Sequence, residues 1–408
     1  MTLGVQFSNL PSQNNELRSR PVCFMLAVGH CGNDWLHSLF DSHPQILTLP
    51  LFNFFDVWRL NFCDRIKTPE DMFLSWEKYI RGEPDRHQIR QQLLHGPEEN
   101  EIFFSIFRER LSSRGISQIE VFWSILQAYA AAKNVDISKI RSILVQEHFP
   151  FAFETFSRDF PNFRVLMLMR DPRAALAGGL KAAANKWGHV PDYHYNINLE
   201  RWLFGQDLWI KLKDKMGESF KVVKNEDLNG NLEYGMRELA CWLGIEFSET
   251  LLQSSLFGKP WGMEGESAYI QPNQKITEQG KDFFSPEKVR LRWKTQLSSG
   301  ETAMIELLLR RFMNKFNYPC DTGDHVFWKI YGFCAFVSLP RGLFRHWLNS
   351  YPAVQEFDVV ARHLKGKYAS ILWNYLPSPV KLISIIIHSM LVRTRFYYFP
   401  KYRGTRYG

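Results

Sequence analysis

The sequence predicts an α/β fold in which a parallel β-sheet is flanked by helices. Short apolar runs at 22–28, 142–146 and 164–169 have the length and composition of strands that are buried on both faces. A further strand is expected at 220–224. Helical patterns follow these runs, as the connections of a parallel sheet require. The chain has 408 residues, of which 45% are hydrophobic and 23% are charged, so it can bury a large core.

The first of these strands leads into a glycine-containing turn. The apolar run ends at Gly29, Gly32 follows, and a helical pattern begins near Trp35. A strand, a glycine turn and a helix in this order direct free backbone N–H groups at a phosphate. The full Walker pattern is absent, because no Gly-Lys-Ser/Thr follows a four-residue gap. The alternative is therefore a buried strand that leads through a tight turn into an ordinary core helix.

Residues 51–140 have mainly helical patterns and interrupt the succession of strands. Ser117 and Glu120 form a capping box ahead of an apolar helical face. We predict a helical insertion on the substrate side, with core packing as the alternative role for its aromatic residues. Residues 1–20 are polar and are expected to form a flexible arm. Later in the chain, helices are expected up to Gly244 and over 300–316.

The net charge of +8 is concentrated at the C-terminal end. Residues 321–408 contain 12 Lys and Arg against 4 Asp and Glu, a difference that equals the net charge of the whole chain. This distribution excludes a general nucleic-acid-binding surface. The tail alternates basic, aromatic and proline residues. It is expected either to form a helical extension that covers the sheet or to attach to an anionic membrane surface. Its longest apolar stretches, at 327–340 and 380–392, fall short of the roughly 20 residues that span a bilayer.

The cysteines indicate the compartment. None of the six forms a CxxC pair or a metal-binding spacing. Several lie in apolar runs, where a thiol behaves as a small hydrophobic group. We therefore predict a reduced, cytoplasmic protein without a metal, either free or peripheral to a membrane through its tail.

Polar residues follow three of the predicted strands at the edge where open α/β sheets bind ligands. They are the loop 29–34, the segment 146–150 and the turn 170–173. In the last of these, two arginines lie near a helix N-terminus, which is a favourable place for a phosphate. The alternative for Arg173 is an ion pair with a neighbouring acid. His148 could accept a proton near neutral pH, although a single histidine is more often structural.

Together these segments resemble the sulfotransferases that use 3′-phosphoadenosine-5′-phosphosulfate (PAPS). The matching segments are GHCGNDW at 29–35, DSHPQI at 41–46, QEHFP at 146–150, FPNFRVLMLMRDPRAALAG at 160–178, VVKNEDL at 222–228 and RWKTQLSSGE at 292–301. DSHPQI is similar to bacterial members in particular. The order and spacing hold over roughly 21–319. The resemblance therefore implies a P-loop-NTPase-like sulfotransferase domain over 21–320, followed by a basic aromatic extension.

The resemblance also implies a role for each candidate residue. His148 would be the catalytic base, His30 stands where the family has its loop lysine, and Glu147 is the neighbouring candidate for the base. PAPS would be held by Gly29 and the backbone of Cys31, Gly32, Asn33 and Asp34, by Trp35 against adenine, and by Arg170 and Arg173 at the 3′-phosphate, with Gly178 and Lys259 nearby. No metal is required.

The predicted function is transfer of a sulfuryl group from PAPS to a hydroxyl or amine of a small-molecule, lipid or saccharide acceptor. Three substitutions leave alternatives open: His30 replaces the family's lysine, Asp34 a threonine and Gly178 a serine. One alternative is a nucleotide-binding or interaction protein that keeps the fold without catalysis. The other is a membrane-surface protein that acts through 321–408. No nucleic-acid partner is expected, and the sequence makes no prediction of the oligomeric state.

Overall fold

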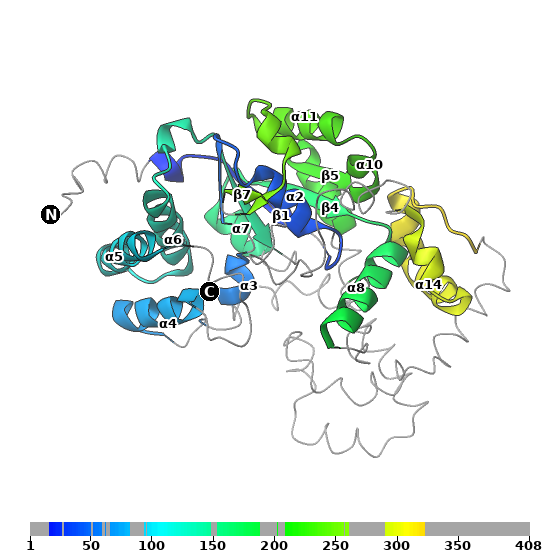
Figure 1. The fold of residues 1–408 in the computed structure, drawn as a ribbon, viewed down its shortest axis with the longest axis horizontal. Helices are drawn as coiled ribbons and strands as arrows, with labels where there is room; N and C mark the ends of the chain where they lie inside the picture. The colour runs from blue at the N-terminus through cyan, green and yellow to red at the C-terminus, as the bar shows by residue number, and fades with distance from the viewer. Residues whose placement is uncertain are drawn as a thin grey trace, which may run out of the picture. The chain divides into compact units, whose positions relative to one another are not determined.

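The structure is a computed structural model, and Figure 1 shows its fold. It describes residues 16–26, 28–49, 52–58, 62, 66–81, 94, 96–147, 153–187, 202, 209–256, 258–260 and 290–322. These residues fall into two compact units. The described residues within Met1–Ala27, Cys31–Arg170 and Leu212–Arg290 form the first unit, and those within Val28–His30, Asp171–Lys211 and Leu291–Gly408 form the second.

The first unit is built on a parallel sheet of five strands in the order β2-β3-β1-β4-β5. The strands are β1 (Val22–Leu26), β2 (Ile46–Thr48), β3 (Ser142–Glu147), β4 (Arg164–Met169) and β5 (Phe220–Lys224). This confirms the predicted α/β class with a parallel sheet. β1 ends two residues earlier than the apolar run, and the three-residue β2 was not predicted. Because β1 is the central strand, the loop that follows it emerges between the ends of β3 and β4.

Aromatic packing covers one face of this sheet. The ring of Phe24 in β1 stacks on Phe156 of α7 (Phe153–Asp159), with 3.6 Å between ring centroids and 5° between ring planes. Phe55 of α3 (Phe54–Val57) meets Phe24 edge-on at 5.7 Å. Such pairs contribute about 0.5–1.5 kcal/mol beyond the burial of their area.

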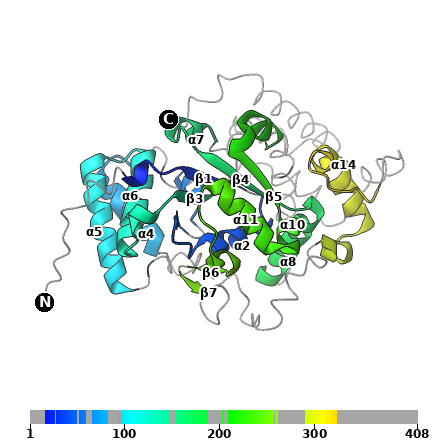
Figure 2. The same ribbon diagram turned by 90° about the horizontal axis from the view of Figure 1, so that it is seen from above.

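The other face is covered by α2 (Asn33–Phe40) and α11 (Leu232–Leu243), which Figure 2 shows across the strands from α7. The short helix η7 (Glu249–Leu252) contacts both of them. As predicted, α11 ends at Gly244, which has a φ of 75°. The remaining elements here are η6 (Gly217–Ser219), α10 (Asn225–Gly230) and the antiparallel pair β6 (Ser255–Leu256) and β7 (Lys259–Pro260).

In the sequence, three long helices separate β2 from β3: α4 (Pro69–Arg81), α5 (Pro97–Arg114) and α6 (Gln118–Ala132), followed by η4 (Ile137–Lys139). α4 packs on α5, and α5 packs on α6. They fall within the predicted helical insertion. Ser117 caps α6 by accepting a hydrogen bond from the Glu120 N–H at 3.4 Å. The capping box is incomplete, because the Glu120 carboxylate pairs instead with the guanidinium of Arg18. Half of the predicted motif is therefore replaced by a long-range ion pair.

The second unit contains α8 (Pro172–Trp187), η8 (Arg292–Thr295) and α14 (Ser299–Lys315), and α8 contacts the other two. α14 begins with a complete capping box between Ser298 and Glu301. Residues 323–408 and 1–15 lie outside the described residues, so the basic extension and most of the flexible arm stay predictions. None of the described helices is long and apolar enough to cross a membrane.

Candidate functional site

The N-terminus of α2 carries no side-chain cap. Its N-cap residue is Gly32, which adopts the left-handed conformation with a φ of 97° and offers no side chain to the helix. The first helical hydrogen bond runs from the Leu36 N–H to the Gly32 carbonyl at 3.0 Å. The N–H groups ahead of Leu36 therefore precede the helical ladder, and they carry the positive end of the helix dipole. This geometry suits an anion.

The shape of the loop depends on a contact with Asn225, the first residue of α10. Asn225 Nδ2 donates a hydrogen bond to the Cys31 carbonyl at 3.0 Å. A Cβ atom on Gly32 would lie 2.4 Å from the same Nδ2 atom, so only glycine permits this approach. Asn229 fixes the amide in turn by donating to Asn225 Oδ1 at 3.0 Å. The segment 222–228 was part of the resemblance, but no sequence pattern indicated that Asn225 supports the loop.

The side chain of Asn33, the first residue of α2, is buried and has no hydrogen-bond partner among the described residues. It is 7% exposed, and neither Nδ2 nor Oδ1 is bonded to any group in the described part of the chain. A buried polar group left in this state costs about 1–3 kcal/mol. One donor and one acceptor are therefore available beside the uncapped N-terminus of α2.

The carboxylate of Asp34 is held by the sheet. Gln146 Nε2, near the end of β3, donates to Asp34 Oδ1 at 2.8 Å. Gln146 Oε1 lies 2.6 Å from His37 Nδ1, and His37 Nε2 contacts the Thr48 hydroxyl. Burial lowers the pKa of His37 to about 4, against a rise from the Gln146 hydrogen bond, so the imidazole is neutral at pH 7. We assign the proton to Nδ1, because Gln146 Oε1 can only accept.

These contacts form a chain, which we call the Asp34 relay: Thr48, His37, Gln146 and Asp34. The Thr48 hydroxyl donates to the Leu144 carbonyl at 2.9 Å and also contacts His37 Nε2. Burial raises the pKa of the Asp34 carboxyl, and the Gln146 hydrogen bond opposes this rise. The relay therefore orients Asp34 Oδ1, while burial disfavours the ionised form of the carboxyl group.

Two candidate catalytic residues lie at the end of β3: Glu147 is its last residue, and His148 is the next residue in the chain. Glu147 is 1% exposed, and its Oε1 accepts a hydrogen bond from the Phe55 N–H of α3 at 2.8 Å. The Glu147 carboxylate therefore caps α3, which is a structural use of the group. His148 lies outside the described residues.

Arg173 belongs to the second unit and is fully engaged there. Its guanidinium is 2% exposed and donates from Nη2 to Asp171 Oδ2 at 2.6 Å and from Nη1 to Glu306 Oε1 at 2.5 Å. It also lies over the ring of Trp293 at 4.1 Å. Asp171 caps α8, as predicted, by accepting from the Arg173 N–H at 2.9 Å. These contacts match the alternative for Arg173, an ion pair with a neighbouring acid, so we leave it out of the proposed binding site.

Other candidate residues are distributed as follows. Cys31 is buried, Trp35 lies partly buried in α2, and Arg170 directly follows β4 with its side chain partly buried. Gly29, His30 and Gly178 belong to the second unit, and Lys259 is in β7, with its side chain outside the described part. No cluster of three His, Cys, Asp or Glu able to hold a metal ion was found among the residues that the structure describes.

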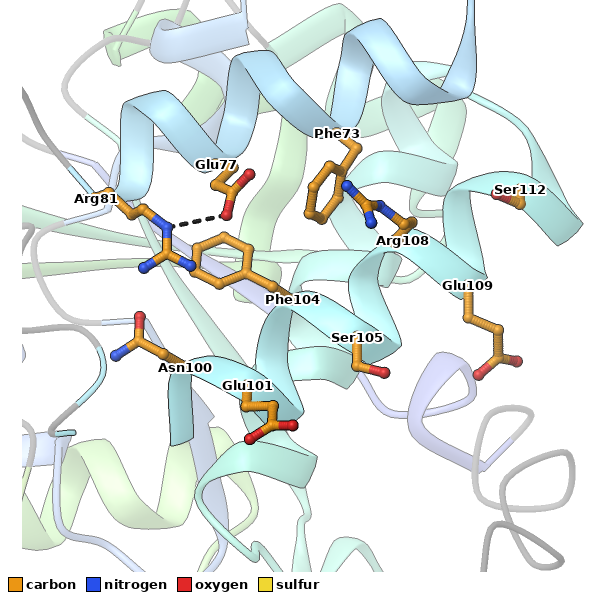
Figure 3. A pocket seen from close by; sticks show the side chains of 10 residues that line it. All are labelled: Phe73, Glu77, Arg81, Asn100, Glu101, Phe104, Ser105, Arg108, Glu109 and Ser112. Atoms are coloured by element: carbon orange, nitrogen blue, oxygen red, sulfur yellow. Dashed lines mark hydrogen bonds and ion pairs between the residues drawn. The ribbon is translucent and has the colours of Figure 1, made fainter. Parts of the chain in front are cut away.

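A groove of about 530 Å³ lies between α4 and α5, and Figure 3 shows its lining. Two guanidinium groups join the helices: Arg81 of α4 lies over Phe104 of α5 at 4.4 Å, and Arg108 of α5 lies over Phe73 of α4 at 4.0 Å. Arg81 also donates to Glu77 at 2.9 Å. The side chains that line the groove therefore hold α4 and α5 together, and we assign no ligand to the groove.

Comparison with known proteins gives structural likeness only. No family model and no curated protein matches the sequence. The sulfotransferase domain of the Synechococcus PCC 7002 olefin synthase is 14% identical, with a TM-score of 0.48, and the match covers 74% of this chain and 95% of that one. The sulfotransferase domain of the curacin biosynthetic pathway has the same identity and TM-score, with 74% and 98% covered.

A third similar structure is retinol dehydratase in a complex with retinol and PAP. It is 13% identical, with a TM-score of 0.35, and the match covers 78% of this chain and 88% of that one. With identities this low and TM-scores below 0.5, these likenesses establish no activity or ligand for the present chain.

The Gly32–Asn225 contact predicts coupled effects on stability. Gly32→Ala introduces left-handed strain of about 1–2 kcal/mol and a clash with Asn225. Asn225→Ala removes two side-chain hydrogen bonds, the one to the Cys31 carbonyl and the one from Asn229, each worth about 1 kcal/mol. The double variant removes the clash, so urea unfolding should show a loss of stability smaller than the sum of the single losses. Strictly additive losses would contradict this contact.

The Arg173 contacts predict a large cost for the loss of its charge. Arg173→Met leaves Asp171 and Glu306 buried without their cation, so we expect the free energy of unfolding to fall by about 3–5 kcal/mol. Arg237→Met is the matched control, because Arg237 pairs with Glu233 while 52% exposed, and it should cost under about 1 kcal/mol. Equal denaturant midpoints for the two variants would refute the structural role of Arg173.

Proposed function

We propose that this chain is a PAPS-dependent sulfotransferase whose loop between β1 and α2 holds the 5′-phosphosulfate. The observation that carries the proposal is Asn33, whose buried amide has no partner in the described chain, beside the uncapped N-terminus of α2. A helix N-terminus stabilises a negative group by about 0.3–1 kcal/mol when exposed and by up to about 2 kcal/mol when partly buried. The residues of the loop therefore fit a bound anion.

In this proposal the residues of the first unit bind and orient the nucleotide. The amides of residues 33 and 34 and Asn33 Nδ2 donate to oxygens of the phosphosulfate. By the resemblance, Trp35 stacks on adenine and Arg170 pairs with the 3′-phosphate. Charge stabilisation and positioning of the two reactants are the contributions the protein makes to a transfer of this kind.

By the resemblance, His148 takes the proton of the acceptor hydroxyl or amine. A bond forms between the acceptor atom and sulfur, while the bond from sulfur to the bridging phosphate oxygen breaks. PAPS supplies the sulfuryl group, and adenosine 3′,5′-bisphosphate leaves. The proposed acceptor is a small molecule, a lipid or a saccharide.

A second candidate function is nucleotide binding without transfer. Two departures from the family's pattern favour it: by the resemblance, Asp34 stands where the family has a threonine and His30 where it has its loop lysine. The Asp34 carboxylate lies at the start of α2, where the phosphosulfate would bind. Membrane attachment through 321–408 stays a prediction, because the extension lies almost entirely outside the described residues. The cytoplasmic location is likewise still a prediction.

Calorimetry with adenosine 3′,5′-bisphosphate tests the binding site. We expect wild type to bind and Asn33→Ala to bind about 10–100-fold more weakly, because a hydrogen bond to a charged ligand contributes about 1.5–3 kcal/mol. Asn162→Ala, which changes an exposed turn residue of the same type, should bind like wild type. If wild type shows no binding at millimolar ligand, the nucleotide site does not exist.

His148→Ala tests the proposed base. Turnover with PAPS should be lost, while affinity for adenosine 3′,5′-bisphosphate should stay within about twofold of wild type, because the base acts on the acceptor. Retained turnover would move the base to His30 or Glu147. If wild type binds the nucleotide but transfers sulfuryl to no member of an acceptor panel, the second candidate function is favoured.

A further inference from the structure

Asp34 is the one carboxylate in the first turn of α2, where the proposed function places an anion. We infer that Asp34 takes up a proton when a phosphate or phosphosulfate binds at this loop, so that it sets the pH range over which the site accepts its ligand. The inference rests on the proposed function and adds to it a residue whose own ionisation controls ligand binding.

The Asp34 relay fixes which part of the carboxylate can respond. With the His37 proton assigned to Nδ1, Gln146 Oε1 accepts from the imidazole and Gln146 Nε2 donates to Asp34 Oδ1. In the described chain, Asp34 Oδ2 has no hydrogen-bond partner and Asp34 makes no ion pair. A proton on Oδ2 would turn this oxygen into a donor, which is what an anion bound at the start of α2 requires.

The charges around Asp34 favour this response. The other titratable or charged groups on α2, on the neighbouring strand ends and on η7 are His37, Asp41, Glu147, Arg170, Lys224 and Glu249. None of them pairs with Asp34: His37 is neutral, and the Glu147 carboxylate is bonded to the amide of Phe55. A second anion placed within a few ångströms of an unneutralised carboxylate favours its protonated form.

Ligand affinity is expected to fall as the pH rises. Burial already raises the pKa of Asp34, and a bound anion raises it further. Below the pKa of the free protein, the carboxyl is protonated before binding and affinity is constant. Between the free and the bound pKa, binding takes up a proton, and affinity falls by up to about tenfold for each unit of rising pH.

The experiment is calorimetric titration of the full chain with adenosine 3′,5′-bisphosphate between pH 5 and 9. At each pH, two buffers with different ionisation enthalpies report the protons taken up. Asp34→Asn is the central variant, because it keeps the shape and loses the charge. Asp227→Asn is the matched control, since Asp227 also lies in the first turn of a helix, α10, with its side chain 65% exposed.

We expect wild type to take up more protons than Asp34→Asn, with a difference that approaches one. We also expect Asp34→Asn to bind at least about tenfold more tightly at the alkaline end. Protonation of the ligand's own phosphates is common to all variants and cancels in the difference. Asp227→Asn should match wild type. If wild type and Asp34→Asn share one pH profile, the inference is wrong while the binding site stands. If neither binds at any pH, the proposed function fails as well.

Gln146→Leu tests the positioning role of the relay. Loss of the Gln146 donor raises the pKa of Asp34 in the free protein, so the pH at which affinity begins to fall should move upward. A residue that only supported the fold would lower affinity equally at every pH. An unshifted pH profile in Gln146→Leu would show that Gln146 does not position the Asp34 carboxyl, while Asp34 would still be the titrating group.

Discussion

The hydrogen bond from Asn225 to the Cys31 carbonyl is the contact on which the candidate site depends. It brings the start of α10 against the loop that follows the central strand, and it leaves no space for a Cβ atom at Gly32. A glycine at this N-cap position cannot cap α2 with a side chain. One steric constraint thus produces both the tight turn and the open N-terminus of a helix. The proposed anion site is therefore a consequence of how the loop is packed.

Two opposing demands meet in the first turn of α2. The helix dipole and the amide of Asn33 favour a negative group, whereas Asp34 brings a negative charge of its own. The relay from Thr48 to Gln146 restrains one Asp34 oxygen, and burial disfavours its ionised state. Proton uptake reconciles these demands, because the neutral carboxyl donates where the carboxylate would repel.

The sequence predicted the parallel α/β class because strands buried on both faces leave a strong apolar signal, as in β1, β3 and β4. It missed β2, since three residues carry too little pattern. Contacts between residues far apart in the chain could not be predicted from the sequence: Glu120 pairs with Arg18, and Asp34 accepts a hydrogen bond from a glutamine 112 positions away. For Arg173 the local sequence permitted both a phosphate and an ion pair, and only the position of Glu306 distinguishes them.

A crystal structure of the chain with adenosine 3′,5′-bisphosphate would show whether the N-terminus of α2 binds the nucleotide. We expect the 5′-phosphate at the N-terminus of α2, with oxygens within about 3.2 Å of Asn33 Nδ2 and of the amides of residues 33 and 34. We also expect Asp34 Oδ2 at hydrogen-bond distance from one of those oxygens. A nucleotide bound elsewhere, with the Asn33 side chain still unpartnered, would contradict the account.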